Sequence, residues 1–126
     1  MLHQFGVRAG RLTLNQFVDL CCTQPARLFG LFPRKGTIAV GSDADIVVWD
    51  SEKPLTLSAA SHHSNVDYNL FEGTEVIGAP ELVMLRGQVI VENDELVASP
   101  GAGRFIARAR FGEALRPISE AGLAAS

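Results

Sequence analysis

Cysteine is scarce in this sequence of 126 residues, and its two cysteines, Cys21 and Cys22, are neighbours. Adjacent cysteines close no useful loop, so a disulfide framework is excluded and a reducing compartment is the consistent location. Free cysteine is among the residue types most often buried. We therefore expect both side chains in the hydrophobic core.

Long apolar runs and a strong excess of one charge are also missing. No stretch approaches the roughly 20 apolar residues that span a bilayer, and the opening residues, MLHQFGVRAGRLTLNQF, lack a basic segment followed by an apolar one. The net charge of −3 and the pI of about 5.5 give no electrostatic reason to bind a phosphate backbone or an anionic lipid surface. The sequence predicts a cytoplasmic protein whose partners include neither nucleic acid nor a membrane.

Motifs of nucleophilic and metal catalysis are absent as well. The sequence has no G-x-S-x-G elbow and no H-x-H pair, and its three histidines are His3, His62 and His63. His62 and His63 could be metal ligands or a proton-transfer pair, but adjacent side chains point apart in a helix or a strand, and a metal site needs three or four ligands. We expect these two histidines to make loop hydrogen bonds or subunit contacts.

A glycine-rich stretch at 101–107, GAGRFIA, begins like a dinucleotide-binding loop. Ile106 stands where the third glycine should be, and no strand–helix–strand unit surrounds it. We interpret it as a turn. The residues alone therefore predict no catalytic, cofactor-binding or metal-binding side chain in this chain.

Three aspartates stand in the stretch at 36–50, GTIAVGSDADIVVWD. On a strand Asp43 and Asp45 would share one face and Asp50 would lie on the other, so local geometry does not bring the carboxylates together. A calcium loop counted from Asp43 fails at most of its positions. We interpret residues 41–43 as a turn whose side chains cap backbone donors, Asp45 as an anchor at a strand start, and residues 46–49 as a strand buried on both faces.

Helices are expected first in the chain and strands after them. Residues 14–22 carry an apolar helical stripe (Leu14, Phe17, Val18, Cys21 and Cys22) with Thr13 as N-cap, and residues 24–29 form a second helix between Thr23 as N-cap and Gly30 as stop. Short β-branched runs then predict strands at 37–40, 45–50, 55–58, 81–86 and 88–93. Hairpin turns are expected at 86–87 and 93–94.

The fold class predicted is α+β, in a chain that is 47% hydrophobic and has the size of one domain or a piece of one. Residues 99–126 lose strand character and gather arginine and small residues, which predicts an extended or partly helical tail. The helical stripe has no evident partner, and the strands have no helices to cover them. The order of elements is typical of the end of a larger protein.

Four stretches together resemble the C-terminal segment of the dihydropyrimidinase and D-hydantoinase family of the amidohydrolase superfamily. They are PARLFGLFPRKGTIAVGSDADIVVWD, TLSAASHHSNVDYNLFEGTEVIG, LVMLRGQVIVENDELV and GAGRFIAR, and the likeness extends from about Leu2 to Arg110. The stretch at 36–50 is similar to the superfamily in general. FPRKG and HHSNVDYNLFEG narrow the resemblance to the cyclic-amide hydrolases.

The resemblance implies a (β/α)₈ barrel with a smaller composite β-sandwich, in an enzyme that assembles as a homotetramer. In those terms 1–35 is the helical remnant of the barrel, 36–98 the sandwich portion and 99–126 the C-terminal tail. The implied activity is ring opening of 5,6-dihydropyrimidines or hydantoins to N-carbamoyl amino acids with two zinc ions in the full-length enzyme. The implied partners are the barrel, the other subunits and a small cyclic amide.

The metal ligands of that family lie upstream of the matching segment, and they include an H-x-H pair and a lysine that carries a carboxyl group. This chain has no H-x-H, and its two lysines, Lys35 and Lys53, stand in expected turns. No catalytic or metal residue is carried over, no cofactor is expected in this chain, and the chain alone is expected to be inactive.

Two non-catalytic alternatives stay open. The collapsin-response mediator proteins resemble PRKGTIAVGSDAD and act by assembly, although SHH at 61–63 in this chain differs from their usual THN and favours the enzyme branch. The other alternative is a free-standing β interaction module that binds the parent oligomer. Such a module would have to cover its helical stripe by self-association, because an exposed apolar surface favours aggregation.

Overall fold

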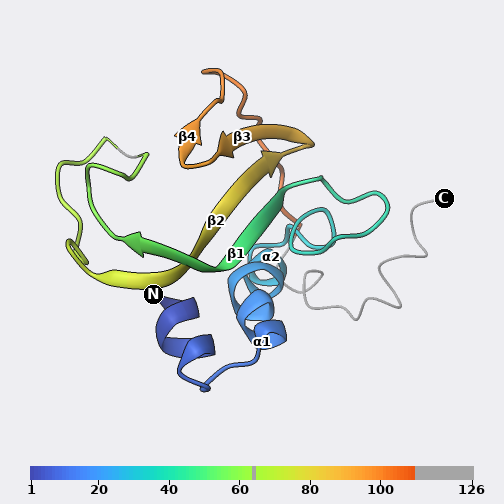
Figure 1. The fold of residues 1–126 in the computed structure, drawn as a ribbon. Coiled ribbons are helices and arrows are strands. Elements are labelled where there is room, and N and C mark those ends of the chain that lie inside the picture. The colour runs from blue at the N-terminus through green and yellow to red at the C-terminus, as the bar shows by residue number, and fades with distance from the viewer. Residues whose placement is uncertain (64, 110–126) are drawn as a thin grey trace. The chain divides into compact units, whose positions relative to one another are not determined.

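The computed structural model describes residues 1–63 and 65–109 (Figure 1). The chain divides into two compact units. The sheet unit comprises 1–12 and 45–102, and the helical unit comprises 13–44 and the chain from 103 onward. The boundary falls between Ala44 and Asp45, inside the aspartate-containing stretch.

The sheet unit is built on one antiparallel sheet of four strands in the order β1-β2-β3-β4. The strands are β1 (Ile46–Thr56), β2 (Glu75–Leu85), β3 (Gln88–Glu92) and β4 (Glu95–Leu96). Figure 1 shows β2 running between β1 and β3. Each strand therefore follows its neighbour in sequence, as in a meander.

Both predicted hairpin turns are confirmed. Arg86 and Gly87 have φ of 49° and 79°, and Asn93 and Asp94 have φ of 51° and 67°. Two consecutive residues with positive φ match the twist of the flanking strands, and asparagine, aspartate and glycine tolerate that conformation best. Arginine is less usual at such a position. The amide of Arg86 donates a hydrogen bond to the carboxylate of Asp45.

The expected strands are confirmed in part. Residues 46–50 of the first run and 55–56 of the second belong to the single strand β1, which continues through a register shift between Asp50 and Pro54. The strand expected at 37–40 is wrong, because those residues have no ladder partner and Ile38 is 84% exposed. Burial of 46–49 on both faces is also wrong, since Val47 is 53% exposed.

The helical unit begins with one continuous helical stretch rather than two helices. It consists of α1 (Leu14–Val18), a π-helical segment η2 (Asp19–Thr23) and α2 (Gln24–Leu28). The helix ends near Gly30, which has φ of +68° as the stop signal predicted. Thr23 is not an N-cap: its backbone is helical, and its hydroxyl donates to the carbonyl of Gly36 at 2.8 Å.

Thr13 is confirmed as the N-cap. Its hydroxyl accepts from the amide of Gln16 at 3.2 Å, while the Gln16 side-chain oxygen accepts from the amide of Thr13 at 2.9 Å. This reciprocal pair is a capping box, which satisfies two backbone donors that the helix leaves unpaired. The start of the helix is thus encoded by residues three apart.

The expected burial of the cysteines is wrong. Cys21 and Cys22 are both exposed, and Leu14 and Val18 of the same stripe are more than half exposed. A helical stripe becomes buried only where another element packs on it. Within the described residues of the helical unit, Leu14, Val18 and both cysteines of this stripe stay exposed.

A π-helical segment η1 (His3–Arg8), which the sequence pattern did not predict, opens the sheet unit. It contacts β2 and buries His3 and Gly6. The buried apolar residues of the described chain are Ala26, Val76 and Ala79, of which the last two lie on β2. The core of the sheet unit therefore lies where β2 meets η1.

Only the first part of the expected tail can be compared with its prediction. The turn predicted at the start of GAGRFIA is present at 100–101, and residues 102–109 are irregular. Ala109 donates its amide to the carbonyl of Gly30 at 2.8 Å. The remaining residues of the tail lie outside the described part, and none of the helices described is long and apolar enough to cross a membrane.

Gly78 and Gly87 offer a matched test of the packing of η1. Gly78 has φ of +102°, and an added Cβ would lie 2.3 Å from Nδ1 of His3, whereas Gly87 has φ of +79° and open space around it. We expect Gly87→Ala to lower the free energy of unfolding by about 1 kcal/mol through backbone strain. Gly78→Ala should lower it by about 3 kcal/mol, because overpacking adds to the strain.

Urea denaturation of the purified chain measures both values. In a His3→Ala background the collision is gone, so Gly78→Ala should then cost about as much as Gly87→Ala. Equal costs of the two glycine substitutions in the wild-type background would contradict the described packing of His3.

Candidate functional site

Asp43, the first of the three aspartates, is held by two cations of the helical unit. Its Oδ2 lies 3.0 Å from Nε of Arg34 and 2.8 Å from Nζ of Lys35. The hydrogen bond from Lys35, helped by Arg34, lowers the pKa of Asp43 below its ordinary value against the opposing effect of partial burial. The carboxylate therefore fixes the loop at 34–43 through its Oδ2.

The predicted backbone capping by the turn at 41–43 is wrong. Ser42 donates its hydroxyl to the carbonyl of Pro33 at 2.8 Å, so it binds an acceptor and not a donor. The amide of Asp43 donates to the carbonyl of Arg34 at 2.9 Å. Two segments of the loop, around 33–35 and 42–43, are thus joined by one side-chain and one backbone hydrogen bond.

The other two aspartates hold backbone amides in the sheet unit. Asp45 accepts from the amide of Arg86 at 2.9 Å, which confirms its role at the start of β1 and supports the arginine in its left-handed turn. Asp50 accepts from the amide of Glu52 at 2.8 Å. Because the three carboxylates bind three different groups, they form no catalytic triad.

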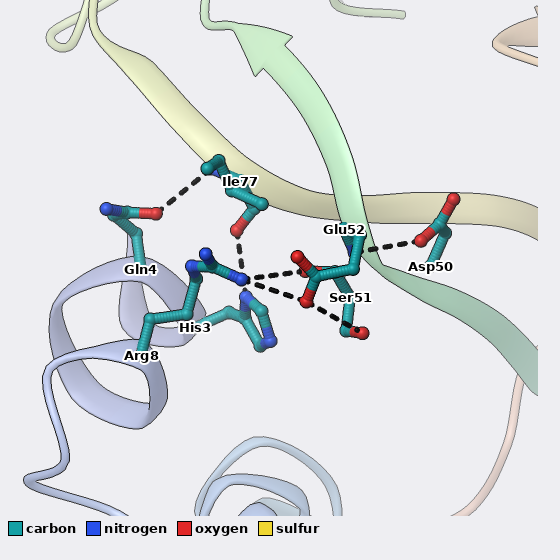
Figure 2. Close-up of polar contacts among 7 residues, drawn as sticks. All are labelled: His3, Gln4, Arg8, Asp50, Ser51, Glu52 and Ile77. Atoms are coloured by element: carbon teal, nitrogen blue, oxygen red, sulfur yellow. Dashed lines mark hydrogen bonds and ion pairs between the residues drawn. The ribbon is translucent and has the colours of Figure 1, made fainter.

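A cluster of polar contacts lies between η1 and the sheet. Figure 2 shows these contacts and labels the residues that make them. His3 places Nδ1 2.9 Å from the carbonyl oxygen of Ile77, so this nitrogen carries the hydrogen and donates. Gln4 accepts from the amide of the same residue at 3.0 Å. Both polar groups of one β2 residue are therefore bound by adjacent side chains of η1.

The register of the sheet explains why side chains are needed there. Ile77 is opposite Pro54 on β1, and proline has no amide hydrogen to donate. Between the pairs Asp50↔Ala79 and Pro54↔Ile77, β1 has three residues and β2 only Gly78. The extra residues, 51–53, form a bulge in β1.

Arg8 binds this bulge from the other end of η1. Its Nη1 lies 3.0 Å from Oε1 of Glu52 and 3.4 Å from the carbonyl oxygen of Ser51 (Figure 2). We call the bonds of His3, Gln4 and Arg8 to the sheet the η1 clamp. The clamp consists of hydrogen bonds to backbone groups of the sheet unit and one ion pair with the Glu52 side chain.

His3 is buried, with 4% of its surface exposed, and its ring lies 5.3 Å from the ring of Trp49. Its Nδ1 is committed to Ile77, and an aromatic ring packs against it. A histidine used as a general base needs a free nitrogen lone pair facing a substrate. The surroundings of His3 instead match a structural donor in the core.

The loop at 58–72 contains the histidine pair. His62 is hydrogen-bonded through Nδ1 to the side-chain amide of Asn69 at 3.2 Å, as expected of a loop residue. The Ser58 hydroxyl and the Ala59 amide lower the pKa of Glu72, and the charge of His62 contributes less. The bonds of His62 and Glu72 brace the loop at its base.

No candidate metal centre emerges from residues 1–63 and 65–109. These residues contain no group of three or more histidine, cysteine, aspartate or glutamate side chains that could hold a metal ion. The part of the chain that the structure describes therefore does not fit the two zinc ions that the resemblance implies. Its best-defined polar sites are the η1 clamp and the ion cluster of Asp43.

Sequence reasoning missed the η1 clamp. His3 and Gln4 reach Ile77 across 74 and 73 positions of the chain, and Arg8 reaches Glu52 across 44. Contacts of that range leave no local pattern in composition or spacing. The nearest available signal was His3 in an otherwise apolar start, which is too weak to predict a partner.

The protein-family comparison matches the amidohydrolase family to residues 1–90. The chain is 51% identical over 112 residues to a D-hydantoinase of Geobacillus stearothermophilus. It is 45% identical over 108 residues to a dihydropyrimidinase of Rattus norvegicus. These matches cover 89% and 86% of this chain and 24% and 21% of the two relatives.

Solved structures agree with the sequence matches. A dihydropyrimidinase from Brevibacillus agri NCHU1002 is similar with a TM-score of 0.84 and 52% identity, over 92% of this chain and 24% of that chain. A D-hydantoinase from a Bacillus sp. AR9 gives a TM-score of 0.82 and 55% identity, over 87% and 24%. The chain thus spans about a quarter of the length of the relatives it matches.

The Asp43 cluster predicts a pH-dependent stability. The pKa of Asp43 is lowered in the folded chain, so its contribution is fully present above the unfolded value, about 3.9, and is lost as the pH falls through the folded value. We expect Asp43→Asn to lower the thermal midpoint at pH 7. The difference from wild type should begin to shrink at about pH 4 and disappear only below the lowered pKa of the folded chain.

Thermal unfolding followed by circular dichroism from pH 7 to pH 2.5 measures this difference. As a control, about 1 M salt should reduce it at pH 7, because the ion pairs are partly exposed and salt screens them. A difference that persisted unchanged to pH 2.5 would assign Asp43 a role other than charge pairing.

Proposed function

Because the chain belongs to the amidohydrolase family, we propose that its residues form the C-terminal part of a metal-dependent hydrolase of cyclic amides. The observation that carries the proposal is the 51% identity, over 89% of this chain, to a protein named D-hydantoinase. The substrates proposed are 5,6-dihydropyrimidines or hydantoins, which are opened to N-carbamoyl amino acids. In this reaction water adds to a ring carbonyl, the C–N bond breaks and the ring nitrogen takes up a proton.

The chemistry of that reaction belongs to residues other than those described in this chain. In the proposed hydrolase two zinc ions would activate the water, and the described residues of this chain offer no set of donors for them. We therefore propose that this segment supplies scaffold and contributes no catalytic step. The purified chain alone is inactive in this proposal.

Exposed apolar side chains support a scaffold that is completed by further protein. Ile38 and Val40 are 84% and 108% exposed, and Leu14 and Val18 on α1 are 58% and 52% exposed. Apolar surface of this kind usually marks a contact with another protein part. We propose that the barrel domain and the other subunits of a homotetramer provide these contacts.

A chimeric enzyme tests the proposal. The matching 112 residues of the Geobacillus stearothermophilus D-hydantoinase are replaced by the corresponding residues of this chain, and hydantoin hydrolysis is measured together with bound zinc. We expect normal zinc content and a kcat/KM within about tenfold of the parent, or about 1.4 kcal/mol of transition-state stabilisation, because the replaced part holds no metal donor. The parent enzyme truncated before the segment is the control and should be inactive.

A folded chimera with full zinc content and no hydrolysis would contradict the scaffold role, because it would show that this segment carries residues the reaction needs. Loss of zinc from a folded chimera would equally contradict it.

The isolated 126-residue chain provides the complementary test. We expect no ring opening of dihydrouracil or hydantoin and no stoichiometric zinc by elemental analysis, since a hydroxide-generating site needs donors that the described residues lack. Hydrolysis above the rate of the buffer, abolished by a chelator and restored by zinc, would overturn the assignment of this segment as non-catalytic.

A further inference from the structure

Cys21 and Cys22 form an exposed pair on the π-helical segment η2 between α1 and α2. The chain has no other cysteine. Helical segments with the π hydrogen-bonding pattern are rare and occur often at functional sites. The proposed hydrolase assigns no role to this pair, so its chemistry is open.

The two thiols are poorly placed to oxidise to a disulfide with each other. Consecutive Cα atoms are about 3.8 Å apart, whereas a disulfide usually joins Cα atoms about 4.4 to 6.8 Å apart. The flanking residues Val18 and Gln24 both have right-handed helical backbone, so the segment is regular at both ends. The pair is therefore kept as two free thiols side by side in sequence.

The polar neighbours of the pair are engaged elsewhere. Both oxygens of Asp19 accept from the side-chain amide of Gln24, at 3.1 and 3.0 Å. The hydroxyl of Thr23 donates to the carbonyl of Gly36. A ligand at this turn would therefore meet two sulfur donors and little else.

The two thiols stand on consecutive residues of one helical turn. Partial burial raises the pKa of Cys22, and the charge of the neighbouring Cys21 raises it further. Neighbouring side chains on a helix diverge by about 100°. Because both residues are exposed, rotation about their Cα–Cβ bonds can turn both sulfur atoms to one ligand.

The number of donors selects the ligand. Zinc takes four protein ligands in structural sites and three in catalytic ones, and among the described residues no group of three such donors exists. The trivalent arsenic atom of an aryl arsenoxide is already bonded to one carbon, so two thiolates complete its three bonds. Thiolates are soft donors and favour soft centres of this kind. A pair of adjacent thiols matches that requirement.

We propose that Cys21 and Cys22 form a dithiol site that captures trivalent arsenicals as a cyclic dithioarsenite. In this step two S–H bonds and the As=O bond break, two As–S bonds form, and the oxygen leaves as one water with both protons. Arsenic stays trivalent and both sulfur atoms stay at the thiol level, so no oxidant or reductant is needed. This proposal concerns the 126-residue chain itself, in which both thiols are exposed, and its test does not measure hydrolysis.

Phenylarsine oxide and the purified full chain test the proposal. We expect one arsenical per chain by intact mass, with the titratable thiols falling from two to none. The adduct should survive an excess of glutathione, a monothiol, and be released by 2,3-dimercaptopropanol, because two linked thiols act at a high effective concentration.

Cys21→Ser and Cys22→Ser are the matched controls, since each keeps one thiol at an exposed position of the same turn. Their adducts should be lost to glutathione, with an apparent affinity at least about 100-fold weaker than that of the wild type. Far-UV circular dichroism checks that the helix is kept.

Two results would overturn the proposal. One is a wild-type adduct that consumes a single thiol. The other is a wild-type adduct that glutathione strips as easily as it strips the single-cysteine adducts. Both are read on the wild-type chain, so they decide the matter even if a variant fails to fold.

Discussion

The sheet unit depends on how the backbone amide and carbonyl of one residue, Ile77, are hydrogen-bonded. Its carbonyl is bound by His3 and its amide by Gln4, at a point where the opposite residue of β1 is a proline. Buried backbone groups without partners are costly, by about 1–3 kcal/mol each. The η1 clamp provides these partners and also determines the position of η1. The His3 ring then lies against the strand at position 78, where only glycine fits. Arg8 is left close enough to bind the bulge.

What the sequence predicted correctly in the fold is local. The cap at Thr13, the stop at Gly30 and the turns at 86–87 and 93–94 each depend on residues within four positions, and turn and cap chemistry acts over that range. The strand at 37–40 failed because a strand needs a ladder partner, which its β-branched residues cannot provide. Burial of Cys21 and Cys22 failed for the same reason, since an apolar stripe predicts a buried face only where a second element covers it.

In the candidate site, too, local features could be predicted from the sequence and contacts between distant residues could not. The prediction that the three aspartates do not converge was correct, and so was Asp45 at the start of β1. The strand faces assumed for Asp43 and Asp45 were wrong, because both residues precede β1. The bonds of Asp43 to Arg34 and Lys35 were not predicted, because the loop that returns residue 43 to residue 34 is a tertiary feature. The η1 clamp joins residues more than 40 positions apart, and only the folded chain shows it.

The chain is 51% identical over 112 residues to a D-hydantoinase, although its described residues hold no group of three or more donors that could bind a metal ion. Several of these residues serve the fold directly. Gly78 lies where a side chain would collide with the His3 ring, Asp45 holds the amide of Arg86 in its left-handed turn, and Asp43 closes a loop through its ion pairs. Each of these residue types fits one local backbone arrangement. The aspartates at 43, 45 and 50 belong to this class, because their acidity serves to hold backbone and neighbouring cations in place.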